Sequence, residues 1–443
     1  MSEYTNPVAD IPRQPTLERA VVIGSGIGGL AAGAALQEIC NEVIIYEKDQ
    51  IPLEPTTRKG VPQDEQLHNL LTRAQEHLEE LMPGFCESLR QQGAGDANVS
   101  LETHVYELGI QMPERDLGLR LMSSWRPKIE YAARELLAGA DNVSLRGLSR
   151  ANGLITDSDN TVRGLIIEDE QGSRTLDASL VIDASGTGSK AHKWFKELDT
   201  EEPQVNELQV GQWYVSMLLD RPTDYTDDKS FWLTFPNPPN TRGGLISPLG
   251  NDQWYISLSG RRLDSPPRTY EEMIEYASSL EEPTIAELIK SSSPCSAPNL
   301  FRKTKASWRR YDLLSNPPSG FMPLGDSIAS LNPLFGQGMS VAAWQAAELK
   351  EVIGTVQGED DIREATMLYL SRAALACSAA WSLGDMVNGI SPNEKLDGRY
   401  WDSLAEAVKH DSDLHRKYVG VWHLIEPVST LYSPDFLQKV ANY

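Results

Sequence analysis

The feature that most constrains this chain is the segment from residue 20 to residue 49. It reads AVVIGSGIGGLAAGAALQEICNEVIIYEKD, in which two β-branched runs flank a glycine cluster and an alanine-rich stretch. This order predicts a βαβ unit with a dinucleotide-binding turn. In such a unit Gly24 forms the tight turn, Gly26 lets the backbone approach a pyrophosphate, and Gly29 lets the helix pack closely on the strand.

The helix start and the acid after the second strand complete this motif. Backbone N–H groups and the positive dipole end of a helix that begins near Gly28 favour phosphate binding. Glu47 stands where its carboxylate can accept hydrogen bonds from a ribose diol, and we expect the adjacent Lys48 at the same cofactor site. NAD and FAD share the adenosine ribose and the pyrophosphate, so this motif alone leaves both cofactors open.

Two later segments narrow the choice of cofactor. Residues 178–188 read ASLVIDASGTG, a strand that runs into Asp183 and Gly186. In the segment FMPLGDSIAS, Gly325 and Asp326 end another strand, and an Asp after a Gly can accept hydrogen bonds from polyol hydroxyls. These features suit the polyol chain of FAD.

A third glycine motif follows, and it opens an alanine-rich helix. It reads Pro333-x-x-Gly336-Gln337-Gly338-Met339. A glycine-flanked helix start directs N–H groups and positive dipole at a nearby anion, and a reduced flavin is such an anion.

Together these motifs resemble the FAD-dependent monooxygenases of the aromatic-hydroxylase superfamily. Further segments are similar to the branch that contains the bacterial polyether-type polyene epoxidases, and the similarity extends from Ala20 to about Leu437. One departure is Gln66, where many relatives carry His, so that only His68 remains of an H-x-H pair. The similar segments are RKGVPQDEQLHNLL, SSWRPKIEYAARELL, VIDASGTGSKAHKWFKELD, GDSIASLNPLFGQGMSVAAWQAAEL and WSLGDMVNG with DGRYWDSLAEAV.

The resemblance implies an α/β fold with a Rossmann-like FAD-binding domain, an antiparallel substrate sheet and a C-terminal helical segment. We expect a discontinuous FAD-binding domain (18–75, 113–200 and 301–350), a substrate-binding domain (76–112 and 201–300) and a helical region (351–443). Alternating, aromatic-bearing runs within 205–262 also predict antiparallel strands, while 266–280 and 282–292 read as helices. On that sheet we expect four aromatic residues to line a substrate cavity: Trp213, Tyr214, Trp232 and Tyr255.

The resemblance also assigns roles to polar residues. Arg58 and Arg126 are expected to contact FAD, and His68 is either a proton carrier or a hydrogen-bonded structural residue. The expected catalytic positions are Pro333, Gly336, Gly338 and His68.

By the same resemblance, the expected activity is transfer of one oxygen atom from O2 to a lipophilic natural product through a flavin C4a-hydroperoxide. The product would be an epoxide or a hydroxylated ring. Oxidase, desaturase or reductase chemistry on the same frame stays open, as does halogenation, although Trp125 is followed by Arg-Pro-Lys rather than the W-x-W-x-I-P segment of tryptophan halogenases. A flavin-binding sensor or assembly scaffold also stays open, whereas a plain NAD dehydrogenase would leave the Gly325-Asp326 and P-x-x-G-Q-G elements unexplained.

Composition limits the partners. With 40 basic and 63 acidic residues the net charge is −23, which disfavours binding to nucleic acid or to anionic membranes. Four dispersed cysteines predict neither a disulfide framework nor a zinc site, which favours a cytoplasmic location. No run of 18 apolar residues occurs, so we expect no membrane-spanning helix. Only one dinucleotide fingerprint is present, so we expect NAD(P)H to dock transiently as reductant, with a separate flavin reductase as the alternative.

Overall fold

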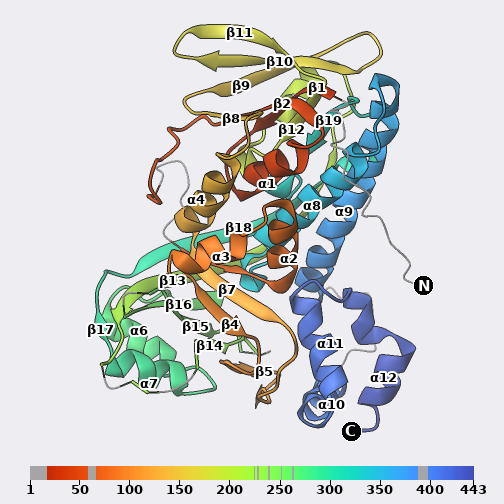
Figure 1. Ribbon diagram of the computed structural model, residues 1–443. Helices are drawn as coiled ribbons and strands as arrows, with labels where there is room; N and C mark the ends of the chain where they lie inside the picture. Colours follow the sequence, from red (N-terminus) through yellow and green to blue (C-terminus); the bar gives the residue numbers. More distant parts are fainter. Residues whose placement is uncertain are drawn as a thin grey trace, which may run out of the picture.

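The computed structural model describes residues 17–57, 66–223, 225–226, 229–237, 240–250, 252–261, 264–387 and 398–443. A parallel sheet with its helices forms the upper half of Figure 1, and a larger, mostly antiparallel sheet forms the lower half. This arrangement agrees with the fold class that the sequence predicts.

The parallel sheet is built from short, buried strands. Its order is β19-β12-β1-β2-β8, and every neighbouring pair is parallel. Val21 and Val22 are both fully buried, as expected for a strand covered on both faces. The strands are β1 (Leu17–Ile23), β2 (Cys40–Tyr46), β8 (Val143–Arg146), β12 (Leu180–Asp183) and β19 (Phe321–Pro323).

Helices join this sheet into one core. Helix α1 (Ile27–Leu36) follows β1 and contacts both α4 (Arg126–Leu137) and α8 (Gly338–Ile353), and α8 in turn contacts α9 (Ile362–Val387). The alanine content of α1 allows these close approaches, because Ala31, Ala32 and Ala35 are completely buried. The βαβ unit predicted over residues 20–49 is confirmed.

Two smaller sheets complete the upper half. A meander of β9 (Arg150–Thr156), β10 (Val162–Asp169) and β11 (Gly172–Asp177) has β10 in contact with β12. A second small sheet has the order β3-β7-β4, formed by Leu67–Leu70, Arg120–Trp125 and Gly95–Asn98.

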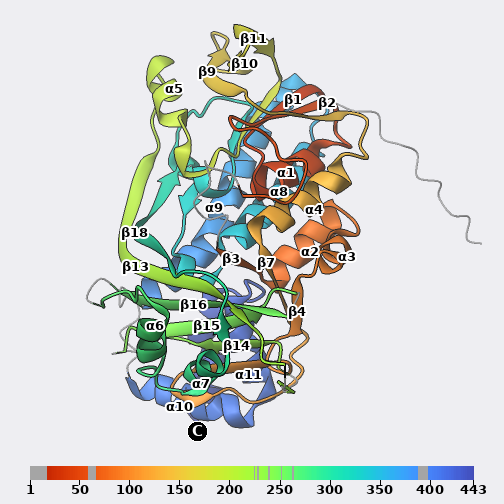
Figure 2. The same ribbon diagram turned by 90° about the vertical axis from the view of Figure 1, so that its left-hand side faces the viewer.

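The larger sheet has the order β20-β18-β13-β16-β15-β14-β5-β6, with β17 paired to β13. Figure 2 shows the long strands β13 and β18 running from the upper half into the lower half. The antiparallel strands predicted within 205–262 are confirmed. The strands are β5 (Thr103–Glu107), β6 (Ile110–Gln111), β13 (Gln204–Asp220), β14 (Phe231–Thr234), β15 (Gly243–Pro248), β16 (Gln253–Arg261), β17 (Ser293–Pro294), β18 (Asn299–Arg310) and β20 (Ala329–Ser330).

Helices α6 (Tyr270–Ala277) and α7 (Thr284–Ser291) cover one face of this sheet and confirm the helices predicted near 266–280 and 282–292. The remaining helices are α2 (Thr72–Leu81), α3 (Phe85–Gln91), α5 (Ala191–Glu197), α10 (Gly398–His410), α11 (Ser412–Trp422) and α12 (Pro434–Val440).

Two segments outside the expected FAD-binding ranges pack into the core of the parallel sheet. Leu78 and Phe85, which we expected in the substrate domain, belong to the core of the parallel sheet. Tyr369 and Ala373 of the expected C-terminal region belong to the same core, because α9 packs against α8. Helices α2, α3 and α9 therefore stabilise the upper half.

Candidate cofactor and substrate site

The first glycine turn is held by backbone packing. Gly24 has φ +101° and donates its N–H to the Tyr46 carbonyl at 2.7 Å. A Cβ added at Gly29 would lie 1.9 Å from the Gly24 carbonyl oxygen, and one at Gly28 would lie 2.8 Å from Leu324 Cδ2. The backbone contact explains why α1 can approach the Gly24 turn so closely only with glycine at position 29, while at Gly28 the helix lies close to the Leu324 side chain.

Gly26 lies at the opening of α1. It is the N-cap residue, and α1 has no side-chain hydrogen bond at its N-terminus. A Cβ at Gly26 would lie 3.2 Å from Arg126 Nη2, and Arg126 Nε donates to buried Glu130 at 2.8 Å. The structure thus places a predicted cofactor-binding arginine directly at a helix N-terminus, where both features favour an anion.

Glu47 is tied to the same turn. Its buried carboxylate accepts hydrogen bonds from the Ser25 N–H and the Ser25 hydroxyl, both at 2.9 Å, and from the Asp49 N–H at 3.1 Å. Lys48 is exposed beside it, and Arg58 lies outside the described residues.

Asp183 ends β12 and is completely buried. Burial raises the pKa of its carboxyl group, opposed by hydrogen bonds from Ser185 Oγ at 2.5 Å and Ser189 Oγ at 2.6 Å. Gly186 follows with φ +72°, and a Cβ there would lie 3.9 Å from Asp326 Cβ. The ends of β12 and β19, distant in sequence, therefore meet at one edge of the sheet.

Asp326 stands within a cluster of cationic side chains. Gly325 precedes it with φ +67° in the 3-10 turn Gly325–Ser327. Burial raises the pKa of Asp326, while the charges of Lys303, Arg126 and Arg309 lower it. Lys303 was not among the predicted residues, because only the pairing of β18 with β20 brings it to Ser330, four residues after Asp326.

The third glycine motif shapes the start of α8. Pro333 opens the 3-10 turn Pro333–Phe335. Gly336 follows with φ +63°, and a Cβ added there would lie 3.8 Å from Asn69 Cβ, an ordinary van der Waals distance. A Cβ at Gly338 would meet no atom within 4 Å, so the helix opens onto free space. The side chains of Gln337 and Met339, on either side of Gly338, are buried.

The Gln337 side chain points toward the C-terminal helices, because its Nε2 donates to the Trp422 carbonyl at 3.0 Å. The Trp422 ring packs between Phe235 and Phe335, with ring centroids 5.0 Å from each. No sequence motif pointed to Trp422, which reaches the site only through tertiary packing.

His68 lies on β3 beside Arg126. Its Nδ1 is 2.9 Å from the Gln66 carbonyl oxygen. Burial, together with the charge of Arg126, lowers the pKa of His68 to about 4, so the imidazole is neutral at pH 7. The Gln66 side chain instead accepts hydrogen bonds from Ser216 Oγ and the Tyr255 hydroxyl, both at 2.8 Å.

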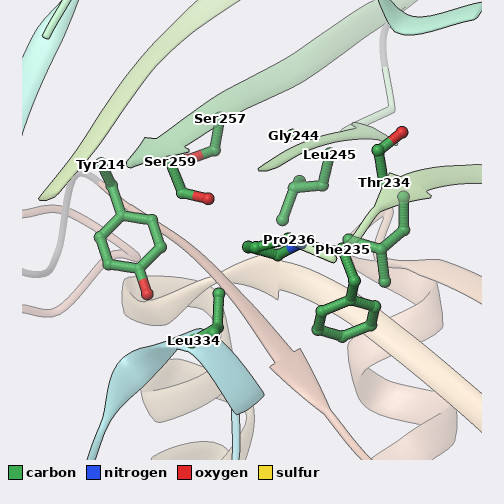
Figure 3. A pocket seen from close by; sticks show the side chains of 10 residues that line it. Tyr214, Thr234, Phe235, Pro236, Gly244, Leu245, Ser257, Ser259 and Leu334 are labelled. Carbon is green, nitrogen blue, oxygen red and sulfur yellow. The ribbon is translucent and has the colours of Figure 1, made fainter. Parts of the chain in front are cut away.

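A small cavity lies between the large sheet and the Pro333–Phe335 turn. Figure 3 shows Tyr214 and Leu334 on adjacent sides of it, with Ser257 and Ser259 on the sheet above. The Tyr214 hydroxyl is buried without a hydrogen-bond partner among the described residues, and burial raises its pKa despite the opposing charge of Arg261. The other lining residues are Leu233, Thr234, Phe235, Pro236, Gly244 and Leu245.

Two of the four residues expected at the cavity, Trp213 and Trp232, do not line it. Trp213 and Trp232 point to the opposite face of the sheet, into the cluster formed with α6 and α7. Trp213 Nε1 donates there to the Arg261 carbonyl at 3.0 Å. Since successive side chains of a strand point to opposite faces, Trp213 cannot share the cavity with Tyr214. Tyr255 lies on the cavity face but is engaged with Gln66.

These residues fit an FAD molecule that lies along the carboxyl edge of the parallel sheet. The α1 N-terminus with Arg126 suits the pyrophosphate, and Gly338 borders open space at the start of α8. Among the described residues no group of three or more His, Cys, Asp or Glu side chains could hold a metal ion. In these ranges every helix is either too short or too polar to span a lipid bilayer.

Comparison with known proteins agrees with this arrangement. Residues 20–228 match the family described as FAD dependent oxidoreductase. The chain is 27% identical over 353 residues to protein Rv3254 of Mycobacterium tuberculosis, covering 76% of this chain and 73% of that protein.

Solved structures share the fold at low sequence identity. The flavin-dependent brominase Bmp2 gives a TM-score of 0.67 at 14% identity, covering 96% of this chain and 97% of that one. The p-nitrophenol 4-monooxygenase PnpA from Pseudomonas putida gives 0.62 at 14% identity, covering 94% and 100%. Residues 20–228 are thus similar to the FAD dependent oxidoreductases, and the chain shares its fold with a flavin-dependent brominase and a monooxygenase.

Proposed function

We propose that this protein is an FAD-dependent monooxygenase that transfers one oxygen atom from O2 to a lipophilic small molecule. The observation that carries the proposal is that α8, which begins at Gly338, contacts both α1 and the Gly325–Ser327 turn, while Leu334 just before α8 lines a cavity under the second sheet. The family match over residues 20–228 supports FAD as the cofactor.

Each element of the site has a binding task. Gly26, the α1 N-terminus and Arg126 hold the pyrophosphate, and Glu47 accepts hydrogen bonds from the adenosine ribose. Asp326 accepts hydrogen bonds from the ribityl hydroxyls. The N–H groups at the start of α8, at Gly338 and Met339, stabilise negative charge on the flavin ring. When bound, FAD supplies the hydride acceptance and oxygen activation that the side chains cannot supply.

The cavity of about 40 Å³ is much smaller than a lipophilic substrate, so its residues would form only one wall of the substrate site and exclude water there. Leu233, Leu245 and Leu334 give it apolar walls, and the Tyr214 hydroxyl offers one hydrogen bond to a substrate oxygen. Neutral His68 serves as a structural residue rather than a proton carrier at pH 7. This environment suits epoxidation of an alkene or hydroxylation of an activated ring, as in the polyene epoxidase branch that the sequence resembles.

The test is a reduction and reoxidation experiment on the FAD-loaded protein. NADPH and then NADH are added without oxygen while the visible flavin band is followed. ¹⁸O2 is then admitted with styrene as alkene probe or phenol as ring probe. Bleaching followed by a product that carries the heavy isotope supports the proposal. Reoxidation with neither probe labelled contradicts monooxygenation of these substrate types and favours an oxidase, desaturase or reductase.

If both nucleotides leave the band unchanged, a separate flavin reductase is added and the labelling is repeated. If the product carries ¹⁸O only when the flavin reductase is present, the protein works as the oxygenase of a two-component system. Absence of labelling in both formats contradicts the proposal.

Halogenation is a second candidate, favoured by the likeness to the brominase Bmp2. The same reaction with bromide present separates the two activities. A brominated phenol without ¹⁸O would favour a halogenase, and ¹⁸O-labelled phenol without bromine favours the monooxygenase.

A further inference from the structure

Lys303 takes an inward-facing position in an exposed stretch of β18. Its neighbours Arg302 and Thr304 are exposed, whereas Lys303 is half-buried and its Nζ donates to Ser330 Oγ. Burial lowers the pKa of Lys303, and the Asp326 carboxylate opposes this change. An ammonium group has three N–H donors, and among the described residues Lys303 uses one of them, on a neutral hydroxyl.

Gln212 stands directly opposite Lys303 in the sheet register. Its side chain is 2% exposed, and its Nε2 has no hydrogen-bond partner among the described residues. A buried amide N–H without a partner costs roughly 1–3 kcal/mol, so a binding partner for it is expected. Directly opposed residues of an antiparallel pair point to the same face, so Gln212 and Lys303 present their donors together.

The position of this pair follows from the strand order. Glu47 follows β2 and Asp326 follows β19, and these strands are three strand spacings apart in the sheet, about 14 Å at the usual spacing. An FAD molecule with its adenosine at Glu47 and its polyol at Asp326 would extend its flavin beyond β19. Lys303 lies close to this point, because its Nζ donates to Ser330 Oγ and Ser330 stands four residues after Asp326.

We propose that Lys303 and Gln212 bind the flavin half of FAD, as donors to its oxygen acceptors. This inference rests on the proposed FAD-dependent function. The ribityl oxygens and the ring carbonyls are acceptors of the required kind. The Lys303 ammonium also places a positive charge where the flavin becomes anionic on reduction.

The test compares two probes that share the adenosine half, FAD and ADP. Their dissociation constants are measured by titration calorimetry for the wild type, Lys303→Met and Gln212→Leu. Loss of a charge-assisted hydrogen bond predicts that Lys303→Met weakens FAD binding about tenfold or more and leaves ADP binding within about twofold. Gln212→Leu removes a neutral donor and predicts a smaller loss, roughly threefold, again for FAD alone.

Two control variants separate charge from structure. Lys305→Met removes an exposed lysine two residues along the same strand, whose Nζ pairs with Glu207 at 2.5 Å, and should change neither probe. Lys303→Arg keeps the positive charge and should recover most of the FAD affinity. Unchanged ADP affinity shows that the variants are folded.

The outcomes are distinguishable. Wild-type protein that binds ADP but not FAD contradicts the proposed function itself. Wild-type binding of FAD with Lys303→Met and Gln212→Leu both unaffected overturns this inference, as does an equal loss for FAD and ADP. If Lys303→Met does not fold, Gln212→Leu carries the same comparison of FAD with ADP.

Discussion

Substitution of Gly29 by alanine tests the packing of the glycine turn most sharply. The added Cβ would lie 1.9 Å from the Gly24 carbonyl oxygen, a backbone atom that no rotamer change can move. Gly28 lies one residue earlier on the same helix, and a Cβ there meets the end of the flexible Leu324 side chain at 2.8 Å. The pair therefore compares a backbone clash with a side-chain clash at matched helix positions.

The expected magnitudes follow from two opposing effects. Replacing glycine by alanine inside a helix stabilises it by up to about 1 kcal/mol. Overpacking against a fixed backbone costs roughly 3 kcal/mol, so Gly29→Ala should lower the free energy of unfolding by about 2 kcal/mol. For Gly28→Ala the Leu324 side chain can move, and we expect a change of less than about 1 kcal/mol.

The assay is urea unfolding of the FAD-free proteins, followed by far-ultraviolet circular dichroism with equal denaturant slopes required for comparison. FAD-free protein is used because cofactor binding would add its own stabilisation. Equal stability of the two variants would refute the reasoning that Gly29 is needed for the approach of α1 to the Gly24 turn.

Three further predictions concern the cofactor site and a buried acid. Gly26→Val should leave FAD-free stability within about 1 kcal/mol, since the contacted Arg126 side chain can move, and should abolish FAD binding in a fluorescence titration; a fully loaded variant would contradict this. Gly338→Val adds a side chain where a Cβ would meet no atom within 4 Å, so the unfolding midpoint should change little, while FAD binding should weaken at least about tenfold. An affinity for FAD equal to that of the wild type would contradict the placement of the flavin at the start of α8. Burial raises the pKa of Glu107 to about 7, opposed by a hydrogen bond from Tyr418 at 2.7 Å, so the folded state binds more protons than the unfolded state and stability falls as pH rises from about 4.5 to 7. Glu107→Gln should therefore raise the unfolding free energy at pH 8 by roughly 3 kcal/mol relative to wild type and change it little at pH 4, and a uniform shift at both pH values would contradict the assignment.

The parts of the fold that sequence predicted best are those governed by local patterns. The run from Ala20 to Asp49 places glycine, alanine and β-branched residues in an order that only a βαβ unit satisfies, and the structure has that unit. The return strand before Asp183 and the strand before Gly325 were identified for the same reason.

The substrate side was predicted less well because it depends on strand direction and register. Adjacent residues Trp213 and Tyr214 were both expected at the cavity, although the two-residue period of a strand allows only one of them there. Gln212 and Lys303 come together through an irregular register between β13 and β18, which no single-sequence pattern encodes.

The remaining residues could not be predicted because they come together only through long-range packing. Trp422 reaches Phe335 and Gln337 across more than eighty residues of chain, through a backbone carbonyl and ring contacts that leave no motif. No sequence pattern indicates the buried pair of Glu107 and Tyr418 either, because the two residues lie on β5 and α11, which are far apart in the chain.

The central claim is that one FAD molecule lies along the carboxyl edge of the parallel sheet, across the α1 N-terminus. The most direct measurement is a titration of FAD into FAD-free protein, with Gly26→Val beside the wild type. We predict one FAD bound per wild-type chain, with a shifted visible spectrum, and none bound to Gly26→Val. No binding to the wild type, or equal binding to both proteins, would contradict it.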